Sequence, residues 1–286
     1  MTDCGPTQHR FVSQRLSLNY LDWGNPTAPL LLLIHGGQDH ARSWDWVARS
    51  LRDEWHVVCP DLRGHGDSSW SRDGSYSLPL FVADLAQLVD HLDESPVSIV
   101  AHSLGGGIAL RYAGLYPELV RKLAVIEGLE ILPIDHKPDL PIIESWRTWI
   151  EQRRALSARS PHRYATLENA CTRMREANPH LTIDHAQHLT IHGLKRNEDG
   201  SCNWKFDNYI RALIPIDLSE NPEELWRNIQ CPVWLVHGAD SWAIHPERDG
   251  KADHFKHVLV TSCEAAGHWV HHDRFDSFLH DLQAFL

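Results

Sequence analysis

The sequence predicts an α/β protein with a mostly parallel central sheet flanked by helices. Short apolar runs alternate with amphipathic helical patterns along most of the chain, which is typical of parallel strands joined by crossover helices. The 286 residues and the 42% apolar content are sufficient for a sizeable core. Prolines and glycines are spread along the chain rather than gathered in one tract, so we expect no long disordered segment.

The apolar runs give the strands in order. The continuous run 30–34 indicates a strand that is buried on both faces. The strands expected are 16–23 in an opening hairpin, 30–34, 56–59, 96–101, 122–126, 233–236 and 257–260. Helical spacing predicts helices at 44–51, 80–92, 108–113 and 272–286.

The strand signal disappears between 129 and 228, and we expect no strand there. Helical patches occur at 142–156 and 167–177, and prolines such as Pro133, Pro138 and Pro215 stand towards the two ends of the stretch. We therefore expect residues 129–228 to form a helical lid inserted into a core of residues 1–128 and 229–286. The arginines and histidines of the lid are interpreted as solvated helix faces.

Ser103 stands between the strand 96–101 and the helix 108–113. A sharp strand-to-helix turn holds its serine in a strained backbone conformation, so the residues two positions away on either side must be small. Those positions are Ala101 and Gly105. The N-terminus of the following helix favours negative charge beside the serine. The pattern predicts that Ser103 is a nucleophile.

His268 follows the last expected strand in a Gly-His turn. We predict that it takes the proton from Ser103 and returns it to the leaving group. His271 and His272 are close neighbours in the sequence, but no carboxylate or thiol beside them completes a metal cluster. We therefore expect no metal ion.

Two acidic residues are candidates for the group that orients His268. Glu127 follows the strand 122–126, and Asp240 follows the strand 233–236. Both stand at the carboxyl end of a strand, where open α/β sheets place their sites. From the residues alone, either carboxylate can accept a hydrogen bond from the imidazole.

Backbone amides are the expected donors to an oxyanion. The residue after the nucleophile, Leu104, supplies one amide, and the loop after the strand 30–34 supplies another through Gly37. Glycines let this backbone approach closely. Gln38 can add a side-chain amide, whereas His35 is interpreted as a structural residue that hydrogen-bonds the loop.

Composition excludes some classes of partner. The formal net charge of −11 argues against nucleic acid or an anionic membrane. The first ten residues are polar, and no stretch is long enough to span a membrane. Six scattered cysteines without a CxxC pair indicate reduced thiols, so we expect a cytoplasmic protein.

Several motifs occur in one order along nearly the whole chain. They are His35-Gly36-Gly37, Asp61–Ser68 (a charged turn expected to brace its loop), Ser103 in its turn, Gly238, and Gly267-His268. With these motifs the chain resembles the α/β-hydrolase superfamily, and most of all its capped members: epoxide hydrolases, haloalkane dehalogenases and serine esterases. The first two of these use an aspartate nucleophile, from which Ser103 departs. The resemblance therefore implies ester-type hydrolysis through an acyl-enzyme.

The resemblance also bears on the orienting acid. In the family, the acid after the late strand usually stands three residues beyond the glycine, which here is Ser241, and Asp240 is one position early. Some dehalogenase relatives instead use a glutamate after the earlier strand, and the segment that begins Ile126-Glu127-Gly128 is similar to theirs. This favours Glu127 over Asp240.

The sequence therefore predicts a serine hydrolase of small carboxylic esters, with lactones and thioesters close behind, and without a cofactor. C–C bond hydrolysis, cofactor-free peroxidase chemistry and a receptor that does not turn its ligand over remain alternatives. Gln38, His102, Trp146, Trp149 and Trp269 are candidate substrate-binding residues, although helix packing explains the lid tryptophans equally well. The expected partner is a small-molecule substrate, and the expected assembly is a monomer or homodimer.

Overall fold

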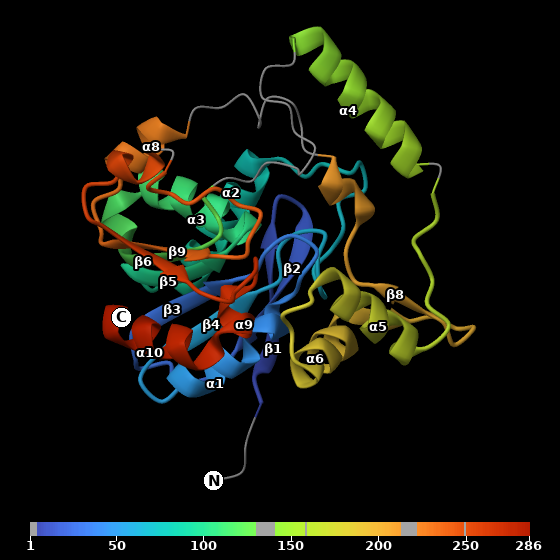
Figure 1. Ribbon diagram of the computed structural model, residues 1–286, viewed down its shortest axis with the longest axis horizontal. Coiled ribbons are helices and arrows are strands. Elements are labelled where there is room, and N and C mark those ends of the chain that lie inside the picture. Colours follow the sequence, from blue (N-terminus) through green and yellow to red (C-terminus); the bar gives the residue numbers. More distant parts are fainter. Residues whose placement is uncertain (1–4, 130–140, 158, 213–221, 249) are drawn as a thin grey trace.

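The computed structural model describes residues 5–129, 141–157, 159–212, 222–248 and 250–286. Eight strands form one sheet in the order β1-β2-β4-β3-β5-β6-β9-β10 (Figure 1). β1 is antiparallel to β2 and β2 to β4, and every later pair is parallel, which confirms the predicted fold class. The strands are β1 (Thr7–Ser13), β2 (Leu16–Asp22), β3 (Leu30–Ile34), β4 (His56–Pro60), β5 (Val97–His102), β6 (Val120–Ile126), β9 (Val233–Gly238) and β10 (Val258–Cys263).

Helices cover both faces of the sheet (Figure 1). One face carries α2 (Leu78–Leu92), α3 (Leu104–Leu115) and α8 (Glu223–Asn228), and the other carries α1 (Asp45–Leu51) and α10 (Phe275–Phe285). Alternate residues of β3 enter the two hydrophobic clusters: Leu32 lies in the first and Leu33 in the second. This double burial explains why the strand is apolar at every position.

Several elements begin or end at other residues than expected. α2 begins at Leu78 because Pro79 is tolerated in the first turn of a helix. α3 begins directly after Ser103 instead of at 108. The expected helix at 272–286 consists of two pieces, α9 (Val270–Asp273) and α10. The described cysteines, which exclude Cys4, are all free.

The expected lid range contains helices α4 (Ile142–Ser157), α5 (Leu167–Ala177) and α6 (Ile183–Gly193). The expectation of no strand there was wrong: β7 (Leu194–Arg196) and β8 (Cys202–Trp204) form a small antiparallel pair. These strands are short and partly polar, so they show no apolar run. Figure 1 shows α4 apart from α5 and α6. Pro133, Pro138 and Pro215 lie outside the described residues.

α8 also falls within the expected lid range, but it packs on α3 of the core. Trp226 of α8 is 1% exposed and belongs to the hydrophobic cluster on that face of the sheet. The last turn before residue 229 is therefore part of the layer that covers the sheet.

Candidate active site

Ser103 lies at the point where β5 gives way to α3. Its backbone has φ 50° and ψ −119°, a conformation that non-glycine residues rarely adopt. The N–H of Ser103 donates to the carbonyl of Ile126 at 2.8 Å, which ties the turn to the neighbouring strand β6. A Cβ at Gly105 would stand 2.5 Å from the carbonyl oxygen of His35, so a side chain there would force the turn away from β3. The small residues around Ser103 are a steric requirement of this turn.

Glu127 lies directly after β6 and brings a carboxylate to His268. His268 Nδ1 stands 3.3 Å from Glu127 Oε2, and the Glu127 side chain is fully buried. Two further donors hold the carboxylate: the Gly238 N–H at 2.6 Å from Oε1 and the Ser241 hydroxyl at 2.5 Å from Oε2. Three donors on one buried carboxylate compensate the loss of water and fix its direction.

Asp240 takes a different place. Its side chain is 53% exposed, and its Oδ2 stands 4.0 Å from His180 Nε2. The next residue, Ser241, occupies the position three beyond Gly238 and donates to Glu127. The two loops that the sequence offered as alternatives therefore meet at one carboxylate, which belongs to Glu127.

The loop after β3 passes against the serine turn. A Cβ at Gly36 would stand 3.0 Å from the Cβ of Ser103 and 2.7 Å from Nδ1 of His102, so only glycine fits without a shift. A Cβ at Gly37 would stand 3.9 Å from the Leu104 side chain. Leu104 is the first residue of α3, and the N–H groups of a first helical turn have no partner within the helix. Gly37 therefore lies beside Leu104, the residue that follows Ser103.

Two motifs brace this loop. His35 Nδ1 lies 2.7 Å from the Gly36 carbonyl oxygen, and its Nε2 accepts from the Leu62 N–H at 3.0 Å. The Asp61 carboxylate accepts from the N–H groups of Ala41 and Asp67. The bond from Asp67 lies within the turn Asp61–Ser68, as expected from its charged residues, and the bonds of Ala41 and His35 connect the turn to the segment after β3.

His102 is buried beneath His268 instead of facing an open space. It is 1% exposed, and its Nε2 lies 3.0 Å from the backbone carbonyl oxygen of His268. The centroids of the two rings are 4.7 Å apart. Burial holds the pKa of His102 well below its usual value, so the ring is neutral at pH 7. His102 thus supports the backbone of the predicted base.

The other predicted substrate-binding residues lie in the loop after β3, on α4 and beside α6. Gln38 is exposed with φ 63°, and its Oε1 accepts from Arg211 at 2.6 Å. Trp146 on α4 is 48% exposed, whereas the Trp149 indole donates to the Ala212 carbonyl. Trp269 packs against a small apolar cluster of α6. The rings of Trp146 and Trp149 lie 5.9 Å apart, and Gln38 and Trp149 bond to the adjacent residues Arg211 and Ala212, whereas the Trp269 ring lies 6.3 Å from that of His102.

Two residues near His268 were not predicted from the sequence to belong to the site. Ser241 donates to Glu127, and the Trp242 ring lies 4.9 Å from the His268 ring. Ser241 was recognised only as the usual position of an acid. Its hydroxyl donor role depends on the register between two loops, which a single sequence does not display.

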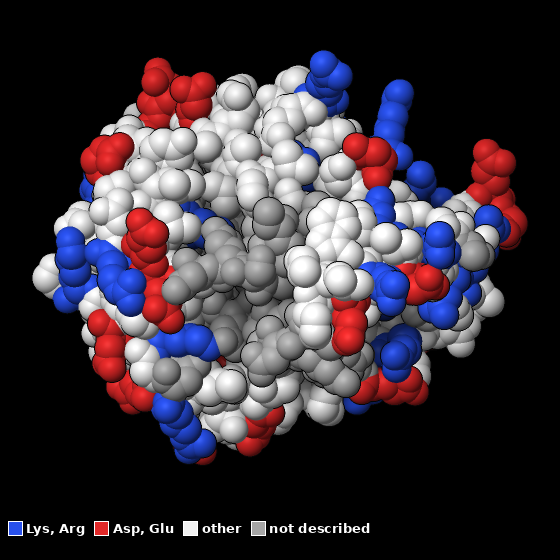
Figure 2. Space-filling model, turned by 90° about the horizontal axis from the view of Figure 1, so that it is seen from above, with Lys and Arg blue, Asp and Glu red and all other residues white. Residues whose placement is uncertain are grey.

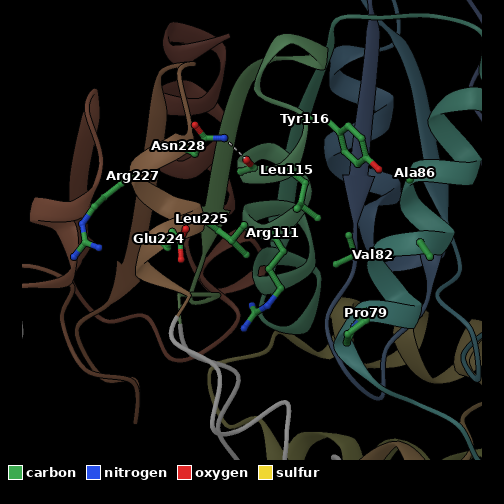
Figure 3. Close-up of a pocket in the computed structure, with 12 residues that line it drawn as sticks. Pro79, Val82, Ala86, Arg111, Leu115, Tyr116, Glu224, Leu225, Arg227 and Asn228 are labelled. Atoms are coloured by element: carbon green, nitrogen blue, oxygen red, sulfur yellow. Dashed lines mark hydrogen bonds between the residues drawn. The ribbon is translucent and has the colours of Figure 1, made fainter.

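A cavity of about 1000 Å³ lies outside this site, between α2, α3 and α8 (Figure 3). Apolar side chains such as Val82, Leu115 and Leu225 line it together with Arg111, whose Nη1 donates to the Gly107 carbonyl. Asn228 donates to the Gly114 carbonyl at 2.7 Å. No predicted catalytic residue lines this cavity.

The family model of the α/β hydrolase fold matches residues 29–178, which is more than half of the chain. The chain therefore belongs to the α/β-hydrolase fold family, and it is a hydrolase. The curated relative esterase Rv0045c of Mycobacterium tuberculosis is 27% identical over 94% of this chain and 86% of its own. A serine hydrolase-like protein of Danio rerio is 29% identical over 62% of this chain and 55% of its own.

A solved structure shares the same fold over nearly the whole chain. The thioesterase domain from the curacin biosynthetic pathway superimposes with a TM-score of 0.85, covers 98% of this chain and 100% of that one, and is 24% identical. Among the described helices none is both long enough and apolar enough to cross a membrane. Figure 2 shows Lys and Arg interspersed with Asp and Glu on the face that it presents.

Proposed function

We propose that the protein is a serine hydrolase that cleaves small-molecule carboxylic esters through an acyl-enzyme. Ser103 is the nucleophile, His268 the general base and Glu127 the acid that orients it. The observation that supports this most strongly is the 3.3 Å contact between His268 Nδ1 and the fully buried carboxylate of Glu127, with Ser103 on its strained turn. Such an arrangement keeps the imidazole in the tautomer whose Nε2 accepts a proton.

The proposed reaction has two halves. Ser103 Oγ attacks the ester carbonyl while His268 takes the hydroxyl proton, and the amides of Gly37 and Leu104 stabilise the oxyanion. Collapse of the intermediate breaks the ester C–O bond, and His268 returns the proton to the leaving alcohol. Water then attacks the acyl-enzyme by the same route, which releases the carboxylic acid and restores Ser103.

The substrate class follows from the nucleophile and from the relatives. A carboxylic ester is the substrate that the esterase relative supports, and a thioester is the second class, in line with the thioesterase domain of similar fold. Lactones react by the same steps. We propose further that the expected insertion, apart from its last helix α8, which packs on α3 of the core, acts as a lid over the site.

Hydrolysis of p-nitrophenyl esters of increasing acyl length tests the proposal. We expect steady turnover in the wild type and a loss of about 10⁴-fold or more in Ser103→Ala. Ser98→Ala is the matched control, because Ser98 lies on the same strand, is 1% exposed, and has a hydroxyl without a partner. Equal rates in wild type and Ser103→Ala would remove Ser103 from the mechanism. Release of a single equivalent without turnover would overturn the hydrolase proposal in favour of a receptor.

A further inference from the structure

Helix α6 presents three histidines to α1. His185, His188 and His192 are spaced by three and four residues, so they share one side of the helix. Asp45 is the first residue of α1. One ligand atom from each of Asp45, His188 and His192 lies within 4.8 Å of the other two. Asp45 comes from the core and the two histidines from the expected lid.

The Asp45 carboxylate is buried and only half satisfied. Its side chain is 1% exposed, and Arg42 Nη2 stands 2.6 Å from its Oδ2. His188 Nε2 approaches the same oxygen at 3.2 Å. The other oxygen, Oδ1, has no hydrogen-bond partner among the residues that the structure describes. A buried carboxylate oxygen without a partner is costly, and a cation is one means of satisfying it.

The two imidazoles offer nitrogen ligands. The His192 ring is partly buried and lies 4.5 Å from the His188 ring, on the same side of α6. His188 Nε2 also lies 3.0 Å from the Arg42 carbonyl oxygen. A metal ion at this nitrogen would replace that hydrogen bond and would share the carboxylate with the Arg42 guanidinium.

We propose that Asp45, His188 and His192 form a site for a divalent transition-metal ion of the Zn²⁺ class, which bridges α6 to α1. Two imidazoles and one carboxylate are ligands that Zn²⁺ accepts, whereas Mg²⁺ and Ca²⁺ prefer oxygen alone. Tetrahedral Zn²⁺ requires ligand atoms roughly 3.3 Å apart. The three ligand atoms now lie within 4.8 Å of one another, so small side-chain rotations would bring them to that separation. Water takes the fourth position.

Ring contacts connect this site to the predicted base. Trp46 packs against His188 at 4.4 Å and His185 at 4.3 Å, and His185 lies 5.3 Å from His272. The His272 ring lies 4.2 Å from that of His271, His271 lies 4.8 Å from His102, and His102 lies 4.7 Å from His268. A metal ion that fixes α6 on α1 therefore acts on the packing behind His268.

Titration with CoCl₂ and ZnCl₂ of protein without a histidine tag tests the site without relying on activity. We expect one Co²⁺ per chain with a visible absorption band of low-symmetry coordination, which Zn²⁺ abolishes by displacement. His192→Gln and His188→Gln should each weaken binding at least about 100-fold, because losing even an outer partner of a ligand costs about 10- to 100-fold. His162→Gln, a matched exposed histidine of the same insertion, should bind as the wild type does. No saturable binding, or equal affinity in His192→Gln and wild type, would overturn the proposal.

A thermal measurement covers the case in which the variants fail to fold. Zn²⁺ at 100 times its Kd should raise the Tm of the wild type by about 5 °C, because it binds the folded chain alone. Mg²⁺ at the same concentration should leave the Tm unchanged. Equal shifts with the two ions, or no shift with Zn²⁺, would contradict the proposal whether or not the protein hydrolyses esters.

Discussion

The sheet that carries the candidate site and the helix α4 of the insertion are held in place by different means. Every residue of β3 and β5 is buried, whereas no described residue of α4 is. Ser103 and Glu127 lie at strand ends, so the packed core holds their backbone in place. α4 is held by polar and ring contacts, such as Arg153 to the carbonyls of Asp73 and Gly74 and over the ring of Tyr209.

This contrast predicts which substitutions should impair the protein and which it should tolerate. A site at strand ends fails when one of its own bonds is removed, because the surrounding frame does not adapt. A surface helix tolerates substitution, because little apolar area is withdrawn from water there. Three substitutions test the contrast, and they are arranged by expected size.

Glu127→Gln should have the largest effect. The amide keeps the volume but presents a donor to Ser241 or His268, so the imidazole is no longer held in the productive tautomer. We expect kcat for p-nitrophenyl ester hydrolysis to fall about 10⁴-fold. Asp240→Asn should change kcat by at most about threefold, since this side chain is largely exposed. Similar losses in both variants, with folding verified by circular dichroism, would contradict the assignment of the acid.

Asp39→Asn should have an intermediate effect that depends on pH. Asp39 follows the Gly36–Gln38 loop and is 5% exposed, and burial raises its pKa to about 7. In the unfolded chain the carboxyl group ionises near pH 4. The buried neutral carboxyl group therefore leaves the free energy of unfolding undiminished below about pH 4. That free energy falls as the pH rises from about 4 through 7.

Asparagine does not ionise, so the Asp39→Asn variant does not lose this stability as the pH rises. Urea denaturation should show the free energy of unfolding of Asp39→Asn above that of wild type by about 4 kcal/mol at pH 8 and nearly equal to it at pH 4. Asp240→Asn serves as an exposed control whose difference from wild type should not vary in this way. A gain of the same size at both pH values would show that burial of the ionised group is not the cause.

Trp146→Ala should have the smallest effect. The side chain is 48% exposed on α4, so the free energy of unfolding should change by about 0.5 kcal/mol or less. Trp149→Ala, its neighbour on the same helix, loses a hydrogen bond to the Ala212 carbonyl and should cost about 1 to 2 kcal/mol. A larger loss in Trp146→Ala than in Trp149→Ala would mean that α4 is held by more than these contacts.

The sheet was predictable because its strands are apolar at almost every position. All five residues of Leu30–Ile34 are apolar, a pattern that indicates a buried strand. α6 was not anticipated, since its histidines at 185, 188 and 192 interrupt the apolar pattern, although Thr182 caps it through the His185 N–H. β7 and β8 are too short to show a period.

The candidate site was predictable in its residue types but not in all its contacts. Ser103 and His268 follow from local motifs, whereas the choice between Glu127 and Asp240 depends on how two loops meet. Asp45 and His188 are 143 positions apart in the sequence, and no local pattern predicts their contact. Contacts of this kind come from the packing of elements, which periodicity does not specify.

The acid at the end of β6 has a consequence for protein engineering. In the proposed scheme the loop after β9 contributes the Ser241 hydroxyl and places the Trp242 ring beside His268, so redesign of this loop for substrate preference should spare these two residues. Glu127, by contrast, stands two residues before the expected insertion begins at Leu129. A recombinant that exchanges the proposed lid should therefore place its junction after Gly128, because a junction at Ile126 would exchange the proposed catalytic acid together with the lid.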